Sequence, residues 1–270
     1  MKVIGSAKNL ELKKMLLLYK KPRERKKQGL FVIEGEREII NAIKSNYILE
    51  RIFLEEGIGF NNVNIKSVIN KTPTSVIEKK TFKKISIRSG GEKIIAIARS
   101  KLHVLKTLKL SRKSIIVVLE EPEKPGNIGA LYRTAAAAKI DAIIISNPKT
   151  DFYNPNSIRS SLGDIFKIPT AIESNENVIS YLKKKEFNIL TTFIKKDSVR
   201  YNEFDYQLPC ALVMGSESEG LSNLWSKVAS ENLVIPMAKT SNSLNLSVSA
   251  GILIYEAIRK NNKLDKNTFL

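Results

Sequence analysis

The chain has 270 residues, of which 43% are hydrophobic and 27% are charged, with a formal net charge of +18. This length favours two domains, and the apolar content is that of globular proteins, so a folded rather than a disordered chain is expected. The single cysteine, Cys210, and the single histidine, His103, exclude disulfides, Cys/His zinc sites and any Ser-His-Asp or Cys-His nucleophile system that does not use these two residues.

The positive charge is concentrated in the N-terminal part of the chain. Residues 1–106 contain 24 Lys and Arg against 10 Asp and Glu, whereas the remainder contains 21 and 17. Such a segment indicates a polyanionic partner, which we interpret as nucleic acid rather than an anionic membrane. No apolar run approaches the ~18 residues of a membrane-spanning helix, and the first residues lack the apolar core of a signal peptide. We therefore expect a soluble, cytoplasmic protein without membrane contact.

The first part of the chain has the pattern of a small α/β domain. Apolar residues at helical spacing predict a helix over residues 6–20, and six basic residues within 20–27 predict a basic loop. The elements expected next are a strand at 30–34, a helix at 36–45, a strand at 49–54 and short elements through 94–98. The domain boundary is predicted near residue 107, which gives domains of residues 1–107 and 108–270.

The second part predicts a parallel sheet with helices on both faces. Residues 115–119 (IIVVL) form an apolar run of strand length, as expected for a strand buried on both faces, and strands then alternate with helices. Cys210 is interpreted as a small packing residue that enters a buried strand. The expected elements are helix 128–138, strand 142–146, helix 156–161, helix 175–185, strand 188–193, strand 211–215, a short helix after Ser222, strand 233–235 and helix 245–260.

Three segments of the second part carry candidate chemistry. In EKPGNIGALYR (residues 123–133), a turn with two glycines opens a helix, and such an N-terminus offers free N–H groups to an anion. Asn127 and Arg133 are six residues apart on that helix and project from different sides. In LVMGSESEGLS (residues 212–222), an apolar strand runs into glycines and carboxylates at its carboxyl end, where open α/β sheets bind ligands.

The third segment is IPMAKTSNSLNLSVSAG (residues 235–251), in which a proline stops a strand and a polar loop leads into a helix. Ser243 is the predicted N-cap of that helix. A core helix does not explain the run of serine and asparagine before it. Neither the GxxxxGK[ST] motif nor the GxGxxG motif is present, which disfavours the common nucleotide-binding enzymes.

In this order, NxGxxxR, GxExxG and IPM…SLNLSVSAG resemble the three motifs of the SpoU/TrmH family of RNA ribose methyltransferases across residues 115–260. The segment RKKQGLFVIEGEREIINAI also resembles the start of the ribosomal-protein-like substrate-binding domain of many members. Because family members that act on transfer RNA often lack that domain, its presence favours ribosomal RNA over transfer RNA as substrate. The predicted RNA-binding residues are Arg23, Arg25, Lys26 and Lys27.

The resemblance implies a trefoil knot in the C-terminal sheet, a homodimer, S-adenosylmethionine as cofactor and no metal. It implies a catalytic set consisting of Arg133, Asn127, Glu217, Ser243 and Asn245. It implies a cofactor-binding set consisting of Gly215, Gly220, Ile235, Met237 and Leu244. Family members are often described with the arginine as general base, but a guanidinium is a donor with a pKa above about 12, so Arg133 is equally a candidate to bind the RNA phosphate and the developing alkoxide.

Two other functions remain as alternatives. One is an RNA-binding or ribosome-assembly protein that has kept the fold without the reaction, although every expected functional position is filled here. The other is a nucleotide-dependent enzyme for a small molecule, motivated by the glycine-containing turn. The basic N-terminal domain argues against it, because a small substrate would not require that domain.

Overall fold

A computed structural model describes residues 2–86, 91–193, 195 and 197–263. The chain divides into two compact units, each considered by itself: unit 1 is Met1–Leu102 with Asp151–Lys167, and unit 2 is His103–Thr150 with Ile168–Leu270. The first junction lies five residues before the expected boundary at 107. Residues 151–167, expected in the second domain, pack with the first unit, so the domain limits of 1–107 and 108–270 stay a prediction.

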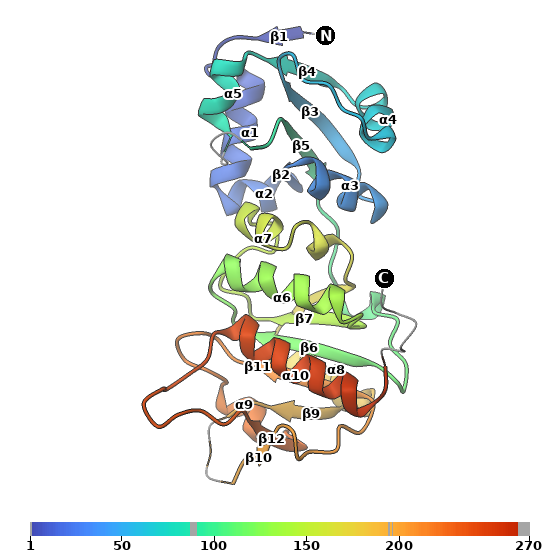
Figure 1. Ribbon diagram of the computed structural model, residues 1–270, viewed down its shortest axis with the longest axis vertical. Coiled ribbons are helices and arrows are strands. Elements are labelled where there is room, and N and C mark those ends of the chain that lie inside the picture. Colours follow the sequence, from blue (N-terminus) through green and yellow to red (C-terminus); the bar gives the residue numbers. More distant parts are fainter. Residues whose placement is uncertain (1, 87–90, 194, 196, 264–270) are drawn as a thin grey trace. The chain divides into compact units, whose positions relative to one another are not determined.

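Unit 1 is a mixed sheet between helices (Figure 1). Its strands, in the order β1-β4-β3-β5-β2, have β1, β4 and β3 parallel to one another and β5 antiparallel to β3 and β2. The strands are β1 (Lys2–Ile4), β2 (Leu30–Glu34), β3 (Leu49–Glu55), β4 (Thr74–Ile77) and β5 (Ile94–Arg99). The helices are α1 (Leu10–Lys20), α2 (Pro22–Gln28), α3 (Glu36–Lys44), α4 (Val63–Lys71), α5 (Lys79–Ile85), α7 (Pro155–Ser160) and the short η2 (Asp164–Phe166).

The basic segment after α1 is a helix, and the prediction of a loop there was wrong. Pro22 stands at the first helical position of α2, where its missing N–H costs nothing, and Gly29 ends the helix with φ +62°. Arg25 is buried: its Nη1 donates to the carbonyl oxygens of Leu18 and Tyr19, and its Nε pairs with Asp151. A side chain held this way cannot reach a phosphate, so Arg25 leaves the predicted RNA-binding set.

Residues 151–167 are anchored in unit 1 by ring contacts and a polar contact. The rings of Phe31 and Tyr153 stack with centroids 4.1 Å apart, and Phe166 lies 4.9 Å from Tyr47. The side-chain amide of Asn41 donates to the carbonyl oxygen of Leu162 at 3.0 Å. This segment connects two strands of unit 2, so its fixed position in unit 1 gives the two units more than one covalent connection.

Unit 2 is built on a parallel sheet, as predicted. Its described strands follow the order β10-β12-β9-β11-β6-β7-β8, and every pair of neighbours is parallel. The strands are β6 (Ile115–Glu120), β7 (Ala142–Ser146), β8 (Thr170–Glu173), β9 (Asn188–Thr191), β10 (Val199–Arg200), β11 (Cys210–Met214) and β12 (Glu231–Val234). The helices are η1 (Leu105–Thr107), α6 (Pro125–Ala137), α8 (Asn175–Lys184), α9 (Asn223–Ser226) and α10 (Leu246–Lys260).

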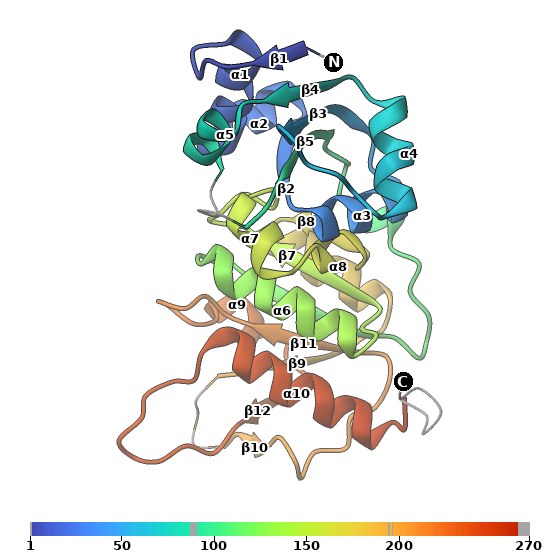
Figure 2. The ribbon, with the colours of Figure 1, turned by 45° about the horizontal axis from the view of Figure 1, so that its top comes forward.

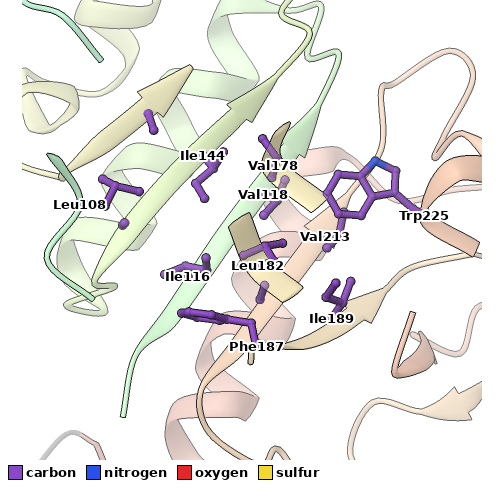
Figure 3. Packing of buried hydrophobic residues seen from close by; sticks show 13 residues of the cluster. Leu108, Ile116, Val118, Ile144, Val178, Leu182, Phe187, Ile189, Val213 and Trp225 are labelled. Atoms are coloured by element: carbon purple, nitrogen blue, oxygen red, sulfur yellow. The ribbon is translucent and has the colours of Figure 1, made fainter. Parts of the chain in front are cut away.

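The core of unit 2 lies on both faces of this sheet. Alternate residues of the central strands, such as Val118 and Val213, pack with Val178 and Leu182 of α8 and with Trp225 (Figure 3). Helices α6 and α10 lie side by side on the other face (Figures 1 and 2). Cys210 is buried in β11, as predicted, and burial raises the pKa of its thiol to about 12.

Candidate cofactor and catalytic site

A cavity of about 610 Å³ opens in unit 2 where parallel strands end. Its walls follow β9, β11 and β12 at their carboxyl ends, together with the start of α6 after β6 and the start of α10. Ligands of open α/β sheets bind at this edge. The lining residues are Lys124, Asn127, Thr192, Phe193, Met214 to Leu221, Leu233 to Ile235, Met237, Ser243 to Leu246 and Ser249.

The loop after β11 is folded tightly at the cavity wall. Ser216 and Gly220 form an antiparallel bridge, and Gly220 has φ +69°, a conformation that favours glycine. A β-carbon on Gly215 would lie 2.1 Å from the carbonyl carbon of Gly220 and 2.3 Å from the amide nitrogen of Leu221. Only glycine at position 215 therefore permits this crossing of the backbone.

Three side chains join the three sequence motifs through hydrogen bonds. The amide of Asn245 donates to Asn127 Oδ1 at 3.0 Å, and the amide of Asn127 donates to Glu217 Oε1 at 2.7 Å. Glu217 also accepts the backbone N–H groups of Glu123 and Lys124, at 3.1 and 3.3 Å. The Glu217 carboxylate thus caps the turn that opens α6 and completes a polar wall of the cavity.

The polar loop before α10 ends at Asn245. Its Oδ1 accepts the backbone N–H of Ser247 at 2.9 Å and the Ser247 hydroxyl at 2.7 Å, so Asn245 is the N-cap of α10. The prediction of Ser243 as the cap was wrong by two residues. Ser243 instead lines the cavity. Asn245 therefore serves both the helix and the network, which fixes the first turn of α10 against α6.

Five apolar residues also line the cavity, namely Met214, Leu233, Ile235, Met237 and Leu244. A lining that combines apolar and polar side chains suits S-adenosylmethionine, whose flat adenine needs aliphatic contacts and whose ribose and amino-acid groups need hydrogen bonds. The volume lies within the range of about 300 to 1,000 Å³ typical of small-molecule sites.

The predicted cofactor-binding residues Gly215, Gly220, Ile235, Met237 and Leu244 all line this cavity. The same holds for four of the predicted catalytic residues, namely Asn127, Glu217, Ser243 and Asn245. The fifth does not: Arg133 lies two turns into α6 with an exposed side chain, and the cavity of its own chain does not include it.

Glu120 is a functional candidate that the sequence analysis missed. This buried carboxylate at the end of β6 accepts the Asn175 amide at 2.6 Å, together with the backbone N–H and the hydroxyl of Ser222, at 2.7 and 2.6 Å. It therefore holds the far end of the loop after β11. An acidic residue that ends an apolar strand was the available signal, because a buried charge requires partners.

Asn232 is a second missed residue. Its amide group pairs with both backbone groups of Phe193, accepting the N–H at 2.7 Å and donating to the carbonyl at 2.8 Å. It also accepts the Thr191 hydroxyl at 3.0 Å. These bonds fix the Thr192–Phe193 wall of the cavity. The strand expected over residues 188–193 ends at Thr191 in β9, so this wall was not anticipated.

Surface charges hold the two loops together at the cavity rim. The Ser218 hydroxyl donates to Glu123 Oε1 at 2.5 Å, and Lys149 lies 3.0 Å from the same oxygen and 3.1 Å from Glu121. These donors hold the pKa of the Glu123 carboxyl below its usual value.

Within the described ranges, no group of three or more His, Cys, Asp or Glu is placed to hold a metal ion. No helix in that part of the chain is long and apolar enough to cross a membrane.

Comparison with known proteins agrees with this geometry. Residues 114–255, which contain the cavity and its network, match the model of the SpoU rRNA Methylase family. The chain belongs to this family. Residues 9–96 match the MRM3-like substrate binding domain, which corresponds to most of the N-terminal part of unit 1. The SpoU resemblance deduced from the three motifs is therefore confirmed.

Several relatives of the SpoU chain are similar over almost their whole length. The Bacillus subtilis 23S rRNA (guanosine(2553)-2′-O)-methyltransferase RlmP is 28% identical over 256 residues, covering 94% of this chain and 98% of the relative. A crystal structure of an RNA 2′-O ribose methyltransferase is 32% identical, covers 96% and 99% of the two chains and has a TM-score of 0.82. The AdoMet-bound rRNA methyltransferase from Sinorhizobium meliloti is 25% identical, with coverage of 96% and 97% and a TM-score of 0.87.

Proposed function

We propose that this SpoU protein transfers a methyl group from S-adenosylmethionine to a ribose 2′-hydroxyl of ribosomal RNA. The observation that carries the proposal is the hydrogen-bonded chain Asn245–Asn127–Glu217, which joins the three family motifs at one cavity. The names of the relatives, an rRNA 2′-O-methyltransferase of Bacillus subtilis and an rRNA methyltransferase of Sinorhizobium meliloti, favour ribosomal over transfer RNA. Ribosomal RNA as substrate also supports the cytoplasm as the site of the reaction.

The residues of the cavity orient the reactants. Bound S-adenosylmethionine supplies an electrophilic methyl group on its sulfonium. Ile235, Met237 and Leu244 would exclude water from the adenine, and backbone groups near Gly215 would hold its edge. The hydrogen-bonded amides of Asn127 and Asn245 keep the polar lining in one arrangement, which would orient the methyl group toward the ribose hydroxyl.

Because Arg133 does not line the cavity of its own chain, it must reach the reacting hydroxyl from elsewhere. It lies on an exposed face that α6 shares with α10. At this contact, a β-carbon added to Gly251 of α10 would lie 3.7 Å from Thr134 Cγ2 of α6. On α10 this face presents Val248 and Tyr255, which are 51% and 47% exposed. Exposed apolar side chains on neighbouring helices favour a partner.

We infer that this face joins two copies of the chain and that Arg133 of one copy acts in the cavity of the other. Helix α10 supports this arrangement, because its first turn both lines the cavity and carries the exposed Val248, and Tyr255 is exposed two turns further on. In that position the guanidinium would bind the RNA phosphate and stabilise the negative charge on the ribose oxygen, as that oxygen displaces the thioether from the methyl carbon and its proton passes to solvent.

Two measurements test the proposed function. Calorimetry should detect S-adenosylmethionine binding to the purified protein, and binding should be absent when millimolar ligand is titrated into a variant whose cavity is blocked by Gly215→Trp. Radiolabelled methyl groups should then enter intact ribosomal RNA and not ribosomal RNA digested to nucleotides beforehand. Labelling of neither sample in the presence of bound cofactor would favour a non-catalytic RNA-binding protein.

A further inference from the structure

One helical layer of unit 1 consists of α1, α2 and α5. Leu12, Met15 and Leu18 of α1 and Phe82 and Ile85 of α5 pack in one cluster on the same face of the sheet. Helices α3 and α4 lie on the other side of these strands (Figures 1 and 2). The two layers can therefore be compared as two surfaces of a single rigid sheet.

Their charges differ strongly. The segment 10–28, which spans α1 and α2, carries eight basic and two acidic residues, and α5 adds four lysines and no acid. Helices α3 and α4 together carry four basic and two acidic residues. The net charge is thus +10 on the first layer and +2 on the second. Most of the N-terminal charge excess therefore lies on one face.

Apart from Arg25, the basic side chains of that first layer form no ion pair within the described part of the chain. All of them except Arg25 are exposed, namely Lys13, Lys14, Lys20, Lys21, Arg23, Lys26, Lys27, Lys79, Lys80, Lys83 and Lys84. In the described part of the chain, no ion pair within 4.0 Å involves any of these eleven. Of the two acids, Glu11 is already paired with Arg51 at 2.7 Å. Uncompensated charges at this density repel one another and are neutralised by a polyanion.

The same layer offers no stacking platform for unpaired bases. The two aromatic residues of these helices are Tyr19, whose hydroxyl is buried, and Phe82, which is 1% exposed. Proteins that read single strands place exposed aromatic rings under the bases, whereas helical RNA is bound through its phosphates. The chemistry of this face therefore fits the backbone of helical RNA.

We propose that the α1/α2/α5 layer is the surface on which unit 1 binds the phosphate backbone of a helical region of the substrate RNA, and that the four lysines of α5 form part of it. This inference rests on the proposed function only for the identity of the RNA. It extends the RNA-binding residues expected from the sequence, Arg23, Lys26 and Lys27, to a helix more than fifty residues further along the chain.

The test compares two variants with the same loss of charge. The first replaces the α5 residues Lys79, Lys80, Lys83 and Lys84 with glutamine. The control replaces Arg37, Lys44, Lys66 and Lys71, which are exposed on α3 and α4, with glutamine. The affinity of each full-length protein for a transcript of large-subunit ribosomal RNA is measured over a series of KCl concentrations. The same series is measured with phosphatidylserine vesicles in place of the RNA, as a second polyanionic probe. Circular dichroism confirms folding of both variants.

The α5 variant should lose at least roughly tenfold in RNA affinity, and its salt slope should fall by about 2 to 4, since each lost phosphate contact lowers the slope by about 1. The control should change by less than about twofold. Three results would overturn the proposal. Both variants could lose the same affinity, the wild type and the variants could all fail to bind RNA, or the vesicles could bind more tightly than RNA through α5. Binding that depends on α5 without methyl transfer would instead contradict the proposed function alone.

Discussion

Asn127 is the residue on which the polar wall of the cavity depends, because it both accepts from Asn245 and donates to Glu217. Replacing it with aspartate removes the donor and sets two carboxylates against each other. We expect Asn127→Asp to weaken S-adenosylmethionine binding roughly tenfold, about 1.4 kcal/mol, by calorimetry.

A matched control exists on the surface of α8, where the amide of Asn177 donates to Glu173 outside the cavity. Asn177→Asp creates the same pair of carboxylates and should leave cofactor affinity unchanged. Equal affinities of the two variants would show that the network does not shape the binding site.

Glu120 makes a prediction about stability at the same scale. In Glu120→Gln an amide group replaces one acceptor oxygen, so at least one of the donors from Asn175 and Ser222 loses its partner. The free energy of unfolding should fall by about 1 to 3 kcal/mol in urea denaturation. Glu186→Gln, which breaks an exposed pair with Arg112, should change it by less than about 1 kcal/mol. A larger loss in the control would contradict the role given to Glu120.

The sequence shows which residues have side chains suited to binding or catalysis, but not always which contacts they make. Asn127, Glu217 and Asn245 were predicted through the motifs, and each lines the cavity. Asn232 was not, because its partner Phe193 is 39 residues away and nothing in either segment signals the pairing. Arg25 was assigned to RNA on charge alone, whereas its burial follows from the turn between α1 and α2.

Among the elements, the loop after β11 has the strictest sequence requirement. In Gly215→Ala the new methyl group would collide with the backbone of Gly220 and Leu221, which cannot move as a side chain can. We expect this variant to lose cofactor binding in calorimetry, because the cavity wall must open. Gly59→Ala, where a β-carbon meets no atom within 4 Å, should bind as the wild type does. Wild-type affinity in Gly215→Ala would mean that the loop adapts.

Elements were predictable, limits included, where turn residues bracket an apolar run, and less so elsewhere. The strands at 30–34 and 142–146 have the expected limits, since apolar runs and turn residues bracket them. The basic segment before Gly29 was taken as a loop because charge was weighed above its helix signals, a proline at the first position and a glycine at the end. Strand β8 was missed because Thr170–Glu173 is too short to show a period.

At the scale of the whole molecule, the exposed position of Arg133 makes the proposed dimer testable by complementation. Arg133→Ala and Asn245→Ala should each be inactive, one through a missing guanidinium and the other through a damaged cavity. If Arg133 acts in the partner's cavity, a mixed dimer has one intact site. An equal mixture after subunit exchange should therefore recover about a quarter of wild-type methyl transfer. If exchange is verified by co-purification of two differently tagged subunits and no activity is recovered, Arg133 acts in its own chain's reaction or outside the reaction.

Features of the whole chain were the least accessible to pattern analysis. The trefoil knot and the dimer follow from the family resemblance and stay predictions. The inclusion of residues 151–167 in unit 1 depends on ring contacts of Phe31 and Tyr47 with Tyr153 and Phe166, which join segments about 120 residues apart. No local periodicity records such contacts, whereas the concentration of charge before residue 106 was visible by counting.

Alkaline hydrolysis of methylated ribosomal RNA tests the central claim most directly. Alkali cleaves RNA through the free 2′-hydroxyl, so a 2′-O-methyl ribose protects the bond that follows it. Ribosomal RNA labelled by this protein with radioactive methyl groups should release the label in alkali-stable dinucleotides. Release of the label as mononucleotides would show that a base is methylated, and ribose methylation by this cavity would then be contradicted.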